Sequence, residues 1–168
     1  MWTDGTKQVA DDAPYTDAQG TQYPGNFPKG QIVGLTYVPP TPPTPAELAA
    51  QLAQAKAAKN QQINVWRSEA NQSSFVYSGK PIACDALSRS DIDAVANSIA
   101  LTGGFPAGFP GAWKAMDNSY VAVPDVGAFK AMHAAMTAQG TMNFGHSQTL
   151  KAALAAATTI EQIDAIVW

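Results

Sequence analysis

A proline-rich segment divides the chain and limits what it can fold into. Five of the seven residues from Pro39 to Pro45 are proline. Proline fixes φ and removes a backbone donor, so the segment favours a stiff polyproline II spacer over a helix or an inner strand. The sequence therefore predicts an extended N-terminal arm with its linker over residues 1–45, a long helix over 46–72 and a compact domain over 73–168.

The N-terminal arm is rich in Pro, Gly, Asp and Gln and poor in aliphatic residues. Such a composition predicts short extended pieces and turns without a core of their own, and a disordered tail is the alternative. Its aromatic residues are expected to anchor the arm against a neighbouring protein. These candidate contacts are Trp2, Tyr15, Tyr23 and Phe27.

The long helix has a recognisable start. Thr44, Pro45 and Glu47 combine an N-cap, a proline at the first helical position and the acid of a capping box. A weak heptad-like seam follows at Leu48, Leu52, Ala55, Lys59, Gln62 and Trp66. Two interpretations stay open: a short coiled coil that joins copies through Leu48 and Leu52, with a trimer favoured, or a helix lying on its own domain.

Two hairpins are predicted in the compact domain. Residues 75–77 and 81–84 favour strands, and Gly79 between them supplies the positive φ of a tight turn. Residues 113–116 and 119–123 bracket Asp117 and Asn118 in the same way. We expect the two hairpins to be able to form one small antiparallel sheet.

Helical patterns occupy the rest of this domain. One helix is predicted over 89–101, with a capping box at 88–91 and an end at Gly103. Others are predicted over 125–139, ending at Gly140, over 141–157, and in a last short helix that opens with a capping box at 158–161. The order of elements predicts an α+β fold of small antiparallel hairpins packed with helices.

The loop between the first predicted helix and the second hairpin carries two phenylalanines. Phe105 and Phe109 are set among proline and glycine residues. They are either contacts for a partner or plugs for the domain's own core, and the sequence favours the second.

No residue pattern predicts catalysis, a cofactor or a metal. Cys84 is the only cysteine, and His133 and His146 are not part of an HExxH pattern. The acids Asp85, Asp91 and Asp93 lie near a helix start, where they favour the helix dipole. We do not expect an enzyme; a glycan or cell-wall hydrolase would need two carboxylates facing one cleft.

Charge and hydropathy exclude some partners. A net charge of −3 offers no cationic surface for nucleic acid, and no apolar run approaches the length of a membrane span, so neither nucleic-acid binding nor membrane insertion is expected. The first residues lack the basic and apolar regions of a signal peptide. We therefore expect synthesis in a cytoplasm.

A scattered pattern over residues 50–168 resembles a domain of unknown function found in small tail-fibre or tail-associated proteins of tailed bacteriophages. The residues that carry it are Trp66, 75–80, Asp85, Ser88, Trp113, 117–118, Val121, His146, 150–151, 156–158 and 166–168. Residues 15–27 are similar to a Tyr-Pro-x-Asn-aromatic segment near the start of such proteins.

The resemblance implies a context and no catalytic residue. It predicts a virion structural protein of a phage tail tip, baseplate or tail fibre, made in the host cytoplasm and located in the virion tail. Its partners would be other tail or fibre proteins and further copies of itself. The alternative is a tail-fibre assembly chaperone or fibre-tip cap.

Overall fold

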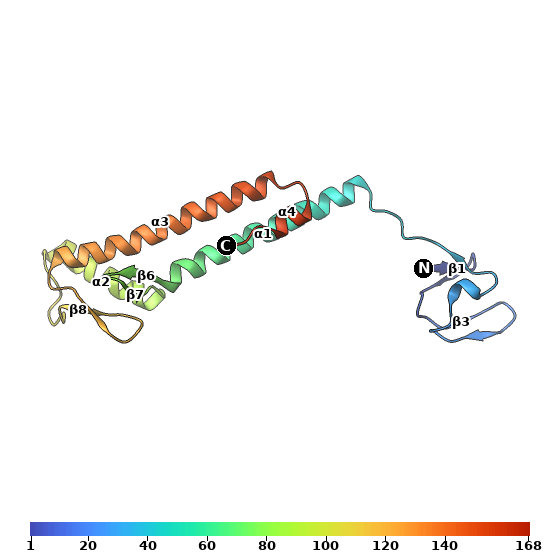
Figure 1. Cartoon of the computed structure of the whole chain (residues 1–168), viewed down its shortest axis with the longest axis horizontal. Helices are drawn as coiled ribbons and strands as arrows, with labels where there is room; N and C mark the ends of the chain where they lie inside the picture. The colour runs from blue at the N-terminus through green and yellow to red at the C-terminus, as the bar shows by residue number, and fades with distance from the viewer. The chain divides into compact units, whose positions relative to one another are not determined.

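The computed structural model describes all 168 residues as two compact units, Met1–Leu48 and Ala49–Trp168. The elements of both units are drawn in Figure 1, and each unit is described by itself. The predicted α+β class is confirmed, since helices are combined with small antiparallel strand pairs. None of the helices combines the length and the apolarity that crossing a bilayer requires.

The first unit is built from short strands around a small core of aromatic and aliphatic residues. Its strands are β1 (Trp2–Thr3), β2 (Gln8–Val9) and β5 (Thr36–Tyr37), in the order β2-β1-β5, and the separate pair β3 (Tyr15–Thr16) and β4 (Gln22–Tyr23). A 3₁₀ turn, η1, covers Lys29–Gln31. The buried residues of its core are Val9, Tyr15 and Ile32.

This core differs from the expectation of an arm without one. Trp2, Tyr23 and Phe27, together with Leu35, pack against the buried residues, and the three aromatic rings add apolar area to that of the few aliphatic side chains. The Lys29 side chain is also buried, and its ammonium donates to the Gly25 carbonyl at 3.0 Å and the Phe27 carbonyl at 3.2 Å. Aromatic and aliphatic side chains therefore combine to give the first unit a core of its own.

Helix α1 (Pro45–Ser73) starts as the sequence predicts. The Thr44 backbone N–H donates to the Glu47 carboxylate at 2.7 Å, and the Glu47 N–H donates to the Thr44 hydroxyl at 3.2 Å. The first of these bonds, followed by one from the Thr44 hydroxyl, lowers the pKa of the Glu47 carboxyl. The capping box is therefore complete.

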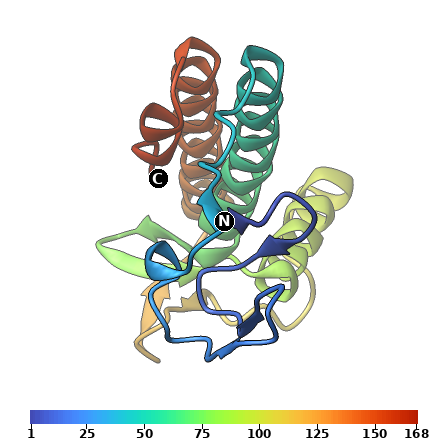
Figure 2. The same cartoon turned by 90° about the vertical axis from the view of Figure 1, so that its right-hand side faces the viewer.

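Helices α1 and α3 (Val126–Ala156) run antiparallel, side by side, in both views (Figures 1 and 2). Their pairing buries Ile63 of α1 against Leu154 near the end of α3 and against the short helix α4 (Ile160–Asp164). The Lys56 ammonium donates to the Ala155 carbonyl at 2.9 Å and the Lys59 ammonium to the Ile166 carbonyl at 3.2 Å. One end of the second unit is thus a three-helix cluster.

The predicted seam of α1 faces this cluster. Leu52, Ala55 and Trp66 pack against it, whereas Leu48 is exposed. Of the two interpretations of the long helix, the structure shows the helix lying on its own domain.

The other end of the second unit holds both hairpins. Strands β6 (Ser74–Tyr77) and β7 (Lys80–Ala83) are joined by Ser78 and Gly79, whose φ angles of 49° and 74° identify the predicted tight turn. Helix α2 (Ala86–Thr102) and the pair β8 (Ala112–Lys114) and β9 (Tyr120–Ala122) follow. Together with the first half of α3 they enclose a core that includes Phe75, Ile92, Val121, Phe129 and Met132.

The hairpins form two separate sheets and not the single sheet that seemed possible. One backbone bond joins them, from the Met116 N–H to the Pro81 carbonyl at 2.9 Å, beside a 3.4 Å ion pair between Lys80 and Asp117. Pro81 has no N–H to return a second bond, so the ladder does not continue there.

Two helix boundaries also differ from the sequence analysis. Helix α2 begins at Ala86, three residues earlier than predicted. Its N-cap is Asp85, because the Asp85 carboxylate accepts from the free N–H groups of Leu87 and Ser88, in place of the predicted capping box at 88–91. Helix α3 continues through Gly140, because buried Met136 and Asn143 on either side lie on one helical face and are held by packing. The predicted end of α2 at Gly103 is confirmed by its φ of 79°.

The continuity of α3 leads to a test of Gly140. Gly140→Ala should raise the free energy of unfolding by roughly 0.5–1 kcal/mol, because alanine favours a helix and the new Cβ would come no closer than 4.0 Å to the Asn71 side chain. Gly103→Ala is the matched control and should destabilise by about 1 kcal/mol, because its φ is left-handed. Denaturant unfolding measures both; a destabilising Gly140→Ala would mean that α3 breaks there.

Candidate functional site

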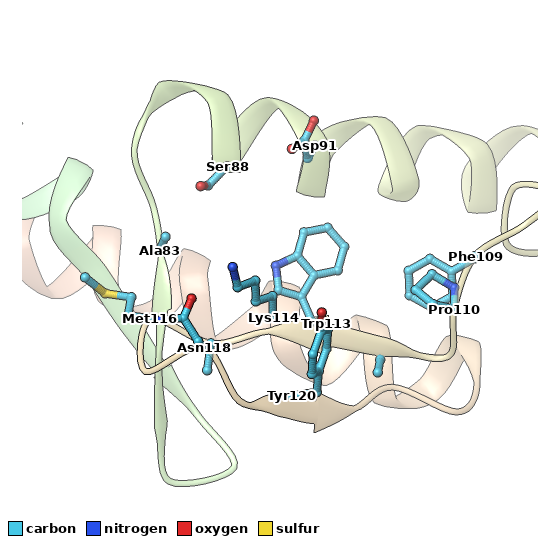
Figure 3. Close-up of a pocket in the computed structure, with 12 residues that line it drawn as sticks. Ala83, Ser88, Asp91, Phe109, Pro110, Trp113, Lys114, Met116, Asn118 and Tyr120 are labelled. Carbon is cyan, nitrogen blue, oxygen red and sulfur yellow. The ribbon is translucent and has the colours of Figure 1, made fainter.

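A cavity of about 560 Å³ lies between α2 and the second hairpin. This volume falls within the roughly 300–1,000 Å³ of typical ligand sites. Figure 3 shows Ser88 and Asp91 on α2 at one side of the cavity and Trp113 and Lys114 of β8 at the other. The remaining lining residues are Ala83, Phe109, Pro110, Ala112, Ala115, Met116, Asn118 and Tyr120.

The N-cap of α2 positions the upper side of this cavity. The Asp85 carboxylate accepts from the Leu87 and Ser88 N–H groups at 3.0 Å each and from the Ser88 hydroxyl at 2.8 Å. These bonds, led by that of the Ser88 backbone, lower the pKa of the Asp85 carboxyl. Asp91 follows Ser88 by three residues, so both lie on the face of α2 that looks onto the cavity.

The turn of the second hairpin fixes the lower side. The Asp117 carboxylate accepts from the Ser119 hydroxyl and from the Ser119 N–H, the latter at 2.9 Å, and these bonds, aided by the Lys80 ammonium, lower the pKa of the Asp117 carboxyl. Asn118 takes the left-handed conformation that the turn requires, with φ of 63°. The ion pair between Lys80 and Asp117 joins this turn to the first hairpin.

Several polar groups of the cavity are free to meet a ligand. The two ion pairs of the chain join Lys80 to Asp117 and His133 to Asp93, so neither Asp91 nor Lys114 is paired. Trp113 is half-buried against Phe109 and Phe129, at ring-centroid distances of 6.4 and 6.2 Å. The cavity thus combines apolar walls with the unpaired carboxylate of Asp91 and the unpaired ammonium group of Lys114.

A second, more apolar groove of about 380 Å³ runs between α2 and α3. It is lined by Ala96, Ile99, Ala100, Phe129, Lys130, His133 and Ala134. The His133 Nε2 atom lies 3.8 Å from the Asp93 carboxylate at its rim. No group of three or more His, Cys, Asp or Glu side chains in the structure could hold a metal ion.

The predicted aromatic contact residues of the first unit lie together and pack into its core. Tyr15 is 8% exposed, and Trp2, Tyr23 and Phe27 are partly buried around it. Their polar atoms bind nearby aspartates: the Trp2 Nε1–H donates to Asp11 at 2.7 Å, the Tyr15 hydroxyl to Asp4 at 3.0 Å and the Tyr23 hydroxyl to Asp17 at 3.2 Å. Within the single chain, these predicted contact residues form a core.

The other predicted contact residues are dispersed. Leu48 is 51% exposed at the start of α1, and Leu52 packs on the three-helix cluster. The rings of Phe105 and Phe109 stack at 4.1 Å and pack against the core of the hairpin end. Only Phe109 also lines the cavity.

Sequence reasoning did not single out the cavity. It placed Trp113 in a hairpin and Asp91 in a helix start, without a reason to bring them together. The sequence offers no signal that pairs Asp91 with Lys114, because their proximity depends on how the hairpin packs on α2.

A comparison with known protein families matches more than half of the chain. A family model described as a domain of unknown function (DUF4376) matches residues 54–167. The match begins within α1 and includes both hairpins, α2, α3 and α4. The chain has no significant match among curated proteins or among solved structures.

The cap of α2 should make stability depend on pH. Because the folded-state pKa of Asp85 lies below its ordinary value of 3.8, its contribution is complete above that pH and is lost as the pH falls through the folded-state pKa. Asp85→Asn keeps a cap without this titration, so its unfolding free energy should fall less than that of the wild type between pH 5 and pH 2.

Urea unfolding across this pH range measures the difference. Asp91→Asn is the matched control, since Asp91 lies on the same helix without a partner, and it should follow the wild-type curve more closely. Equal pH dependence of Asp85→Asn and the wild type would contradict the role given to the cap.

Proposed function

We propose that this chain, which belongs to the DUF4376 family, is a structural component of a bacteriophage tail that acts by binding other proteins. The resemblance of residues 50–168 and 15–27 to phage tail proteins supports the phage context. A tail tip, a baseplate or a tail fibre is the proposed location, reached after synthesis in the host cytoplasm.

The organisation of the chain is the observation that carries the binding role. Each of the two units has its own core, and the proline-rich residues 39–45 lie in the sequence between the core residues of the first unit and the start of α1. A proline-rich segment of this kind acts as a semi-rigid spacer in the chain. Such a chain can bind one tail component with its first unit and another, or a further copy, with its second.

Quantitative mass spectrometry of purified phage particles and of infected-cell lysate tests this proposal. A structural component should occur in particles at a fixed copy number that is a multiple of three or six. Abundance in the lysate with absence from the particles would contradict it and would identify an assembly chaperone instead.

Self-association is part of the proposal, with a trimer favoured. Because the seam of α1 is occupied within the chain, copies would meet through the small residues exposed on the outer faces of the two long helices. These residues are Ala50, Ala57 and Val65 on α1 and Ala138 and Ala152 on α3.

Sedimentation velocity measures this association directly. The wild type should sediment as a trimer, and Ala57→Arg with Ala152→Arg should give monomers of unchanged helix content, because arginine favours helices but cannot be packed between them without a partner. Ala94→Arg, at an exposed position of α2, is the control and should remain trimeric. A monomeric wild type at micromolar concentration would exclude the trimer.

A further inference from the structure

Strand β8 has an open backbone edge. Bonds from the Ala115 N–H to the Ser119 carbonyl, 2.8 Å, and from the Val123 N–H to the Gly111 carbonyl, 2.9 Å, lie at its two ends. Bonded and unbonded pairs alternate in an antiparallel ladder, so Trp113 is bonded to Val121. Ala112 and Lys114 therefore point their backbone N–H and C=O groups away from β9.

Strand β7 has an open edge for the same reason. The Cys84 N–H donates to the Ser73 carbonyl at 3.3 Å, which places Ile82 among the bonded residues and directs the backbone groups of Pro81 and Ala83 outward. The Met116–Pro81 bond joins the two open edges at one point only. The 560 Å³ cavity lies beside the rest of these two edges, and Ala83, Ala112 and Lys114 are among its lining residues.

We propose that this cavity binds an extended peptide segment of a partner protein, which adds as a strand to β8. The segment's backbone would donate to and accept from Ala112 and Lys114, as in other cases of strand addition to a sheet edge. This deepens the proposed function, on which it rests for the identity of the partner, by naming the kind of segment that the second unit recognises.

The side chains around the edge define the segment further. Because alternate residues of a strand point to opposite sides, one side chain of the segment would enter the cavity between strands and helix. The apolar wall formed by Trp113, Phe109 and Pro110 favours a large apolar side chain there (Figure 3). Asp91 and Lys114, both unpaired, favour polar residues on either side of it.

The backbone edge favours a peptide over a saccharide. Aromatic rings beside a carboxylate also suit sugars, but a sugar leaves the regularly spaced N–H and C=O groups of Ala112 and Lys114 without matched partners. An extended backbone repeats at the same spacing and satisfies both residues. Saccharide binding is accordingly an outcome of the test that would overturn the proposal.

Proline substitution provides a sharp test at Lys114. Since the ladder with β9 uses residues 113 and 115, Lys114→Pro removes an outward N–H without removing a β8–β9 bond. Lys114→Thr is the matched control, because it removes the same charge and keeps the N–H.

The probe is a library of acetylated hexapeptide amides with the four central positions randomised, screened against the full-length chain. The selected peptides should carry a large apolar residue among the four, and in NMR spectra their binding should slow hydrogen exchange of the Ala112 and Lys114 amides. Lys114→Pro should weaken the best peptide about tenfold or more, and Lys114→Thr should weaken it much less.

A second measurement tests the proposal on the wild-type chain, in case the Lys114→Pro variant fails to fold. Methylating the peptide amides that face β8 should abolish binding, while methylating the alternate amides should not. The proposal is overturned if no peptide binds, if both sets of methylations act equally, or if chito-oligosaccharide or glucan probes bind without changing the two amides. None of these results bears on whether the chain occurs in phage particles.

Discussion

The amide contact between Asn71 and Asn143 fixes how the two long helices of the second unit align. Asn143 is 7% exposed, and its Nδ2 donates to the Asn71 side-chain oxygen at 2.9 Å, while Gln139 donates to Asn143 at 3.1 Å. A slip of one helix along the other would leave the buried Asn143 amide without its partners, at a cost of about 1–3 kcal/mol. Polar residues placed in this way specify register more than they add stability.

That register determines which elements pack at each end of the helix pair. On one side of the amide layer, Ile63 meets Leu154 and α4, and on the other side α1 passes directly into β6. The Arg89 guanidinium donates to the Asn71 carbonyl at 3.1 Å and to the Cys84 sulfur at 3.1 Å, so the start of α2 is held at the same layer. The cavity between α2 and β8 therefore depends on an alignment set by residues that do not line it.

Local chemistry explains which parts of this structure the sequence could predict. The capping box at Thr44, the turn at Gly79 and the helix end at Gly103 depend on residues within one turn of each other, and all three are confirmed. The continuation of α3 through Gly140 was missed, because burial on both sides outweighs the weak helix propensity of one glycine. The cavity was missed because its walls come from segments that only tertiary packing brings together.

The open edge of β8 has features that limit indiscriminate pairing. The strand is three residues long, a charged lysine occupies it, and Pro81 ends the contact with β7, all of which are devices that protect sheet edges from aggregation. An edge protected in this way still offers two residues with outward backbone groups, Ala112 and Lys114, next to an apolar wall at Trp113. A flat strand from another molecule gains little there, whereas a segment whose apolar side chain fills the cavity gains both backbone bonds and apolar burial. Selectivity at this edge would therefore come from the cavity, and affinity from the backbone.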